Sequence, residues 1–462
     1  MKTILTSILT SILMASLAVA TASLATAAEN PSAAYIQRTM KTLEESTAEN
    51  PARVRVMFYG QSITAQAWTR IVEKTLQERY PTVQFEFRNA AIGGYTSNVL
   101  IRTAEHDLYP WYPDLLFFHV YGPMDKYEEI VKRVRERTAA EIVLWTSHLN
   151  VASLDEPNSI NTSHDERAVA IRAVAPKYDC MLIDLREKWR AHLAENGLMV
   201  KDLLTDAVHL NPQGCELYAR LILEELVRAP KLGDNPTAAG TITTIPLDSP
   251  QVTRGADGSL TLQFTGNRVV AVSDGTGGAE AKAAVLLDGK PMAAMKELWA
   301  ISRPSVGPAG IWMPAINHVG FEQPLVEEDW TLTCLPDSAP DGTKIHFRVE
   351  GSVTGADGEG WSTEPFVSRS GRVVIEPDDW RVAWTLGYRK ATLPEGFKVT
   401  WRSYAMFTAL YVPQPAEARA LLMQGCANEP HTLTLKAEGG SPGIRALILH
   451  SPASPSPPKA HP

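Results

Sequence analysis

The chain has 462 residues, of which 44% are hydrophobic and 21% charged, and its formal net charge is -8. This is an ordinary globular composition, and the length predicts two or three domains. The negative charge and the lack of any run of five or more basic residues argue against a nucleic-acid-binding protein. No cysteine or histidine spacing resembles a zinc site, and we expect no metal or other cofactor.

Residues 1–27 are predicted to be an export signal. Lys2 is their only charge, a long stretch of apolar and small residues follows, and Ala25-Thr26-Ala27 fits an A-x-A cleavage site. A membrane anchor is the alternative, but the stretch is rich in Ser, Thr and Ala and no stop-transfer charges follow it. We therefore expect a secreted or periplasmic protein with no stable membrane insertion after cleavage.

Residues 28–230 alternate between short apolar runs and helical patterns, which predicts strands alternating with helices. The expected strands are Val54–Tyr59, Val83–Phe87, Leu115–Val120, Ile142–Trp145 and Met181–Ile183. The expected helices are Trp68–Arg79, Asn98–Asp107, Tyr127–Thr138, Asp165–Ala175, Leu185–Asn196 and Gln213–Val227. This order is typical of a three-layer α/β domain with a mostly parallel sheet, in which sites form at the carboxyl ends of the strands.

The pattern changes after Pro230. Residues 231–244 are polar and contain Gly and Pro, as a linker does. Residues 245–451 consist of short alternating runs broken by turn signals, which predicts an all-β, sandwich-like accessory domain. The Pro- and Ser-rich residues 452–462 are expected to be a disordered tail.

The predicted β region is rich in tryptophan. Its tryptophans include Trp330, Trp361, Trp380, Trp384 and Trp401. Sugar rings stack on aromatic faces, so carbohydrate binding is one interpretation, but the favoured interpretation is that these side chains form the core.

Four cysteines follow the export signal, two in each half of the chain: Cys180, Cys215, Cys334 and Cys426. An exported protein can form disulfides, and pairing within each half would join Cys180 to Cys215 and Cys334 to Cys426. Four buried free thiols are an equally weighted alternative.

Two segments offer hydrolytic chemistry. Gly60-Gln61-Ser62 follows the first predicted strand, where the serine is either a helix N-cap or a side chain presented for reaction. Asp206 and His209 are three residues apart in a loop before the last predicted helix, a spacing that lets a carboxylate orient an imidazole. A serine hydroxyl becomes a nucleophile when such a histidine takes its proton.

These segments resemble the SGNH (GDSL-type) hydrolase superfamily, closest to its secreted carbohydrate acetylesterases. Residues 59–64 (YGQSIT) resemble the nucleophile block and residues 88–98 (RNAAIGGYTSN) resemble the second block. Residues 119–127 (HVYGPMDKY) fall where the third block belongs, and residues 206–214 (DAVHLNPQG) resemble the Asp-His block. The resemblance spans about residues 50–228 and implies an SGNH, flavodoxin-like fold.

The resemblance also implies roles for individual residues. Ser62 would be the nucleophile, His209 the general base and later the acid, and Asp206 the residue that orients His209. The backbone N–H groups of Ser62 and Gly94 would form the oxyanion hole. The pair Gly93-Gly94 has a second interpretation, a plain turn after the second strand.

Two positions depart from the family pattern. Gln61 stands where the family often has Asp, a variant found among its acetylesterases, and it removes a negative charge beside the serine. Met124 stands where the family usually has an Asn that donates to the oxyanion, and the loss of one such donor typically costs about 10²–10³ in rate. The nearby groups that could replace it are Tyr121, Lys126, Tyr127 and His148.

We therefore expect an exported serine esterase that removes acetyl groups from a carbohydrate, with an acetylated carbohydrate or other ester as its partner. A lipase or thioesterase on the same scaffold is a second hypothesis. A non-catalytic glycan-binding protein on this fold is a third, supported by the missing Asn and opposed by the complete set of Ser62, Asp206 and His209.

Overall fold

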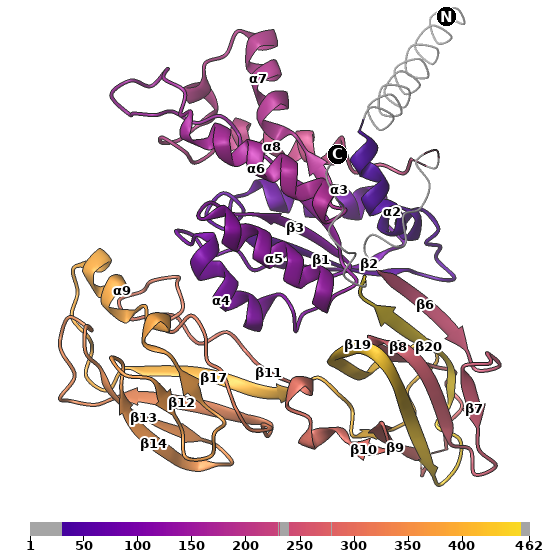
Figure 1. The fold of residues 1–462 in the computed structure, drawn as a ribbon. Helices are drawn as coiled ribbons and strands as arrows, with labels where there is room; N and C mark the ends of the chain where they lie inside the picture. The colour runs from indigo at the N-terminus through magenta and orange to yellow at the C-terminus, as the bar shows by residue number, and fades with distance from the viewer. Residues whose placement is uncertain (1–29, 230, 232–239, 279, 454–462) are drawn as a thin grey trace, which may run out of the picture.

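The computed structural model describes residues 30–229, 231, 240–278 and 280–453 (Figure 1). The predicted export signal, most of the predicted linker and the end of the predicted tail lie outside these residues. Of the helices in the described segments, none has both the length and the apolar character needed to cross a membrane.

Five parallel strands form the first sheet, in the order β2-β1-β3-β4-β5. They are β1 (Arg53–Gly60), β2 (Gln84–Asn89), β3 (Leu115–His119), β4 (Glu141–Trp145) and β5 (Met181–Ile183). β3 and β4 are buried along their whole length because helices cover both faces of the sheet. The strand order reverses at β1 and β3, so their carboxyl ends border the crevice in which such sheets form their sites.

The helices divide into two layers around this sheet. One layer contains η1 (Pro31–Ile36), α2 (Gln37–Glu44), α3 (Trp68–Arg79), α7 (Leu185–Asn196), η2 (Val200–Leu203) and α8 (Pro212–Leu223). The other contains α4 (Ser97–Asp107), α5 (Met124–Arg137) and α6 (Ser163–Lys177). Alternate side chains of β1 belong to the two cores, Phe58 to the first and Tyr59 to the second. The predicted three-layer α/β fold is confirmed.

The rest of the chain forms antiparallel sheets, as predicted, and β6 begins inside the stretch expected to be a linker. One eight-stranded sheet contains β6 (Thr241–Pro246), β7 (Val252–Arg254), β8 (Leu260–Ser273), β9 (Lys282–Leu287), β10 (Lys290–Pro291), β18 (Leu410–Tyr411), β19 (Arg419–Glu438) and β20 (Ile444–Ser451). A five-stranded sheet contains β11 (Trp299–Ile301), β12 (Glu328–Cys334), β13 (His346–Gly351), β14 (Gly355–Trp361) and β17 (Lys398–Ala405). A two-stranded sheet joins β15 (Phe366–Val367) to β16 (Val374–Ile375).

The five-stranded sheet is an insertion into the eight-stranded one, because its residues lie between β10 and β18 in the chain (Figure 1). We call residues 299–405 the inserted unit; it also carries α9 (Val382–Arg389). The two larger sheets pack against separate hydrophobic cores rather than facing each other over a shared one. The predicted sandwich-like domain therefore consists mainly of two antiparallel sheets, each with a hydrophobic core of its own.

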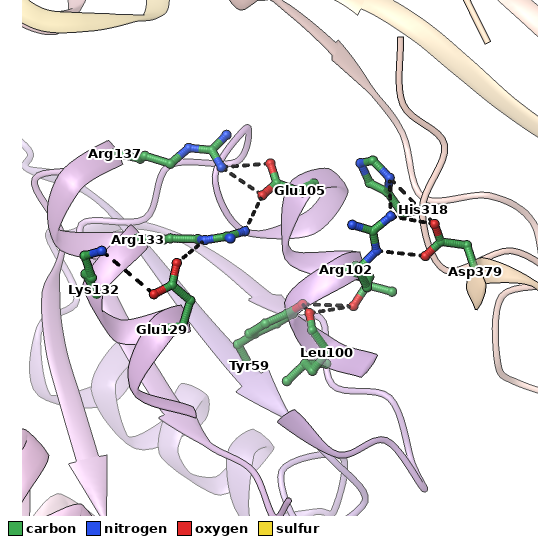
Figure 2. A network of polar contacts seen from close by, with 11 residues as sticks. Tyr59, Leu100, Arg102, Glu105, Glu129, Lys132, Arg133, Arg137, His318 and Asp379 are labelled. Carbon is green, nitrogen blue, oxygen red and sulfur yellow. Dashed lines mark hydrogen bonds and ion pairs between the residues drawn. The ribbon is translucent and has the colours of Figure 1, made fainter. Parts of the chain in front are cut away.

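The inserted unit is joined to α4 by two ion pairs whose carboxylates are buried. Arg303 of the insertion binds Asp107 with a closest N–O distance of 2.6 Å, and Asp107 is fully buried. Arg102 of α4 binds Asp379 of the insertion, also at 2.6 Å. Figure 2 shows this second pair beside the ion pairs that join α4 to α5. Removing one partner of such a pair leaves an uncompensated charge, so these contacts fix the insertion against the α/β unit.

All four cysteines are free and buried. Cys180 and Cys215 lie in the cores on opposite faces of the parallel sheet. Cys334 and Cys426 lie in the separate cores of the two antiparallel sheets. The pairing within each half of the chain is therefore wrong, and the free-thiol alternative holds, because each predicted pair is divided between two cores.

A buried histidine makes the junction between α4 and the insertion sensitive to acid. His106 Nδ1 lies 2.9 Å from the carbonyl oxygen of Ile301, and its Nε2 accepts the N–H of Val319 at 3.2 Å. The ring is therefore neutral in this contact, with its proton on Nδ1. Burial first, and then the neighbouring His318, lower the pKa of His106 to about 4, and Asp107 and Glu105 only partly offset this.

We expect stability to fall as the pH drops from about 6.5, the ordinary histidine value, toward 4, because the unfolded chain then binds a proton that the folded chain excludes. The contribution of His106 to this loss is about 3 kcal/mol. Urea unfolding of wild type and His106→Asn between pH 7 and 4 measures it, since the variant should show a shallower dependence on pH. Equal slopes for both proteins would contradict the assignment.

Candidate active site

Ser62 lies in the turn that connects β1 to α3. β1 ends at Gly60, where a side chain would overlap the carbonyl oxygen of His119 on β3, so only glycine allows this close approach. α3 begins at Trp68 and its N-cap position is Ala67. Ser62 is therefore not the N-cap of α3, and its half-buried side chain is free for other contacts.

The structure brings Ser62, His209 and Asp206 together. The Ser62 Oγ lies 2.9 Å from His209 Nε2, and His209 Nδ1 lies 2.8 Å from Asp206 Oδ2. The other carboxylate oxygen, Oδ1, accepts the backbone N–H groups of Val208 and His209, each at 2.8 Å. Burial alone would raise the pKa of Asp206, but these backbone bonds and the imidazole outweigh it and lower the pKa. The carboxylate thus stays ionised and can hold a proton on Nδ1, which leaves Nε2 to accept one from the serine.

The backbone of the loop that carries His209 is bound by Gln66, which the sequence analysis did not name, and by His148, which it named only as a possible oxyanion donor. The Gln66 amide donates to the carbonyl oxygen of Leu210 at 3.0 Å and accepts the N–H of the same residue at 3.1 Å. His148 is fully buried, and its Nε2 lies 2.8 Å from the carbonyl oxygen of Val208. Both residues contact backbone atoms of the His209 loop, and no motif or spacing in the sequence indicates this role.

Two backbone N–H groups beside the serine are unpaired. Within the described part of the chain, neither the N–H of Ser62 nor that of Gly94 has an acceptor. Gly94 has a φ of +78°, which glycine adopts without strain. The inserted unit holds this turn, because the Tyr95 hydroxyl donates to Asn317 at 2.6 Å and a Cβ at Gly94 would lie 2.7 Å from Met313 Cε. Free backbone N–H groups next to a nucleophile can donate hydrogen bonds to an oxyanion and so stabilise its negative charge.

Met124 is the first residue of α5, and it supplies no donor. Of the groups expected as replacements, Lys126 pairs with Asp125 at 3.5 Å and Tyr127 is buried in the core of the second helix layer. His148 is committed to the loop of His209, as described above. Of these candidates, Tyr121 and Tyr127 each keep a buried hydroxyl without a hydrogen-bond partner among the described residues. Two backbone donors are therefore the oxyanion groups that the geometry supports directly.

The insertion also contributes a residue to the edge of the site. Trp312 Nε1 donates to the carbonyl oxygen of Gly93 at 2.8 Å, although the two residues are 219 positions apart.

Gln61, beside the nucleophile, is buried, and neither polar atom of its amide has a partner in the described segments. As for metals, the described residues include no group of three or more His, Cys, Asp or Glu that could hold one.

Known proteins resemble the α/β unit. Residues 58–217 match the model of the GDSL-like Lipase/Acylhydrolase family. Comparison with curated proteins gave no match.

Solved structures also resemble parts of the chain. An acetyl xylan esterase (AlAXEase) is 23% identical over 38% of this chain and 100% of its own, with a TM-score of 0.34. An acetylxylan esterase from Geobacillus stearothermophilus is 20% identical over 38% of this chain and 95% of its own, with a TM-score of 0.34. A two-domain esterase active on acetylated mannans is 12% identical over 90% of this chain and 95% of its own, with a TM-score of 0.36.

The match to the family model runs from the end of β1 into α8, and it includes Ser62, Gly94, Asp206 and His209. The segment 58–217 is therefore a GDSL-like lipase/acylhydrolase domain of the SGNH hydrolase superfamily.

Proposed function

We propose that this protein is an exported serine esterase that removes acetyl groups from a carbohydrate. One observation carries the proposal: His209 Nε2 lies 2.9 Å from Ser62 Oγ while Asp206 holds the opposite ring nitrogen at 2.8 Å. This is the arrangement in which a serine becomes a nucleophile.

The reaction would proceed in two acyl transfers. Ser62 Oγ attacks the acetyl carbonyl carbon as His209 takes its proton, and the N–H groups of Ser62 and Gly94 stabilise the oxyanion. The intermediate collapses, the bond to the sugar oxygen breaks, and His209 returns the proton to the leaving hydroxyl. Water, deprotonated by His209, then attacks the acetyl-serine; the bond from the acyl carbon to Ser62 Oγ breaks, His209 returns the proton to Ser62, and acetate leaves.

Two features support a small acyl group and an exported enzyme. Gln61 before the serine is a variant that, by the resemblance to the family, occurs among its acetylesterases. The predicted export signal would place the enzyme where polysaccharides occur.

The acyl group can be tested with p-nitrophenyl esters of increasing chain length. We expect kcat/KM to be highest for the acetate ester and to be at least about tenfold lower for the octanoate ester. The reason is that each added methylene needs an apolar protein surface to pack against. A rate that rises with chain length would contradict an acetylesterase and favour the lipase or thioesterase hypothesis.

The carbohydrate can be tested by measuring acetate release from a panel of acetylated polysaccharides with the purified mature protein. Release from at least one of them supports the proposal. Binding without release, unchanged in Ser62→Ala, would instead support the non-catalytic hypothesis.

A further inference from the structure

The exposed aromatic side chains of this protein gather in one place. Among the described residues, every Phe, Trp and Tyr is buried or half-buried except Trp312, Trp384 and Tyr388, which are 45%, 41% and 57% exposed. The segments outside the described residues contain no Phe, Trp or Tyr. All three exposed rings lie on the inserted unit, and we call them the aromatic strip.

The three rings form a continuous row. Tyr388 and Trp384 are four residues apart on α9, so they share one face of that helix, and their rings stack with centroids 5.2 Å apart. Tyr388 in turn contacts Trp312 edge-on, with centroids 6.0 Å apart. The order along the row is therefore Trp312, Tyr388 and Trp384.

The row begins beside the nucleophile. A Cβ placed on Gly93 would lie 3.1 Å from Trp312 Nε1 and 3.7 Å from Ser62 Cβ, so the indole and the serine approach the same point. The hydrogen bond from Trp312 to the Gly93 carbonyl oxygen fixes the indole there. The neighbouring Ile311 and Met313 anchor this loop, because both are buried in the core of the α/β unit.

From these observations we infer that the aromatic strip binds the sugar residues of a glycan chain on one side of the ester that Ser62 attacks. The inference rests on the proposed function and assigns the inserted unit a role in holding the substrate chain. Pyranose rings present flat C–H faces that pack on aromatic rings, and their hydroxyls need polar partners at the edges.

The surroundings of the strip supply such partners. The guanidinium of Arg389 lies 5.6 Å from the Trp312 ring centroid and 5.8 Å from that of Tyr388. Arg381 lies 5.0 Å from the centroid of Trp384. Flat rings with charged donors beside them fit a polar, ring-shaped ligand better than an apolar protein surface. Their continuity with Ser62 favours a chain that extends from the reacting sugar.

The test uses the full-length mature protein and the variants Tyr388→Ala, Trp384→Ala and the double variant. Tyr388→Phe is the matched control that keeps the ring, and Val367→Ala removes a side chain that is 50% exposed elsewhere on the inserted unit. The substrates are p-nitrophenyl acetate, which has no sugar, and partially acetylated xylo- and manno-oligosaccharides of increasing length. Binding of the same oligosaccharides to each variant in a Ser62→Ala background is measured by calorimetry.

We expect KM for the oligosaccharides to rise about three- to tenfold for each ring removed, and by more than any change on p-nitrophenyl acetate. The preference for longer oligosaccharides should weaken in parallel, while Tyr388→Phe and Val367→Ala behave as wild type. Calorimetry should show a matching loss of affinity.

An equal loss on both kinds of substrate, or affinity that does not depend on the rings, would overturn the inference. Self-association that is lost in Tyr388→Ala, with unchanged glycan affinity, would also overturn it and assign the strip to a second copy of the chain. Ring-dependent binding without acetate release would refute the proposed function and leave the glycan site standing.

Discussion

Replacing Ser62 with alanine is expected to lower kcat for p-nitrophenyl acetate by at least about 10⁴-fold. The hydroxyl that lies 2.9 Å from His209 Nε2 is the only group in the arrangement that can form the acetyl-enzyme. Removing it leaves the fold intact, because Ser62 is half-buried and its side chain makes no other hydrogen bond among the described residues. The free energy of unfolding should therefore stay close to that of wild type.

Comparison with His209→Ala and with the double variant makes this experiment specific. If the two residues act as one unit, the double variant is no slower than either single variant, since each substitution already removes the shared step. Ser163→Ala, which changes an exposed serine at the start of α6, controls for the substitution itself and should retain full activity. Independent, multiplying losses would contradict a proton transfer between Ser62 and His209.

The parts of the site that could be predicted from the sequence are those set by local structure. Ser62 follows a buried strand, and parallel sheets gather such strand ends at one edge. Asp206 and His209 are three residues apart, so one turn of backbone brings the carboxylate to the ring. These relations depend on residues that are close in the sequence and not on contacts with distant segments.

The parts that could not be predicted depend on contacts between distant segments. Trp312 reaches Gly93 across 219 positions because the inserted unit docks on α4 through ion pairs with buried carboxylates. Gln66 and His148 act on backbone groups, and such contacts leave no side-chain pattern to recognise. The sequence also could not separate buried from exposed tryptophans. Trp330 and Trp401 are buried, as the core interpretation predicted, whereas Trp384 is exposed.

The second large effect is expected at Gly94, where alanine should lower kcat by about 10²–10³-fold. Its φ of +78° is one that side chains rarely adopt, and the new Cβ would meet Met313 Cε at 2.7 Å. The Met313 methyl ends a flexible side chain and can shift, whereas relieving the strained φ turns the peptide and moves the N–H away from the oxyanion. With Met124 in place of the usual Asn, the site has few other donors to compensate. Steady-state kinetics on p-nitrophenyl acetate should show the loss in kcat rather than in KM, because the interaction forms in the transition state.

A matched control separates this loss from simple backbone strain. Gly197 has a φ of +63° and open space around it, at the end of α7 and away from the serine. Gly197→Ala should therefore cost about 1–2 kcal/mol of stability without loss of kcat. Adding Met313→Ala to Gly94→Ala removes the steric contact but not the strained φ, so any recovery measures the part of the loss that the inserted unit imposes. Wild-type kcat in Gly94→Ala would exclude its N–H from the oxyanion hole and leave the N–H of Ser62 as the only backbone donor that the geometry supports.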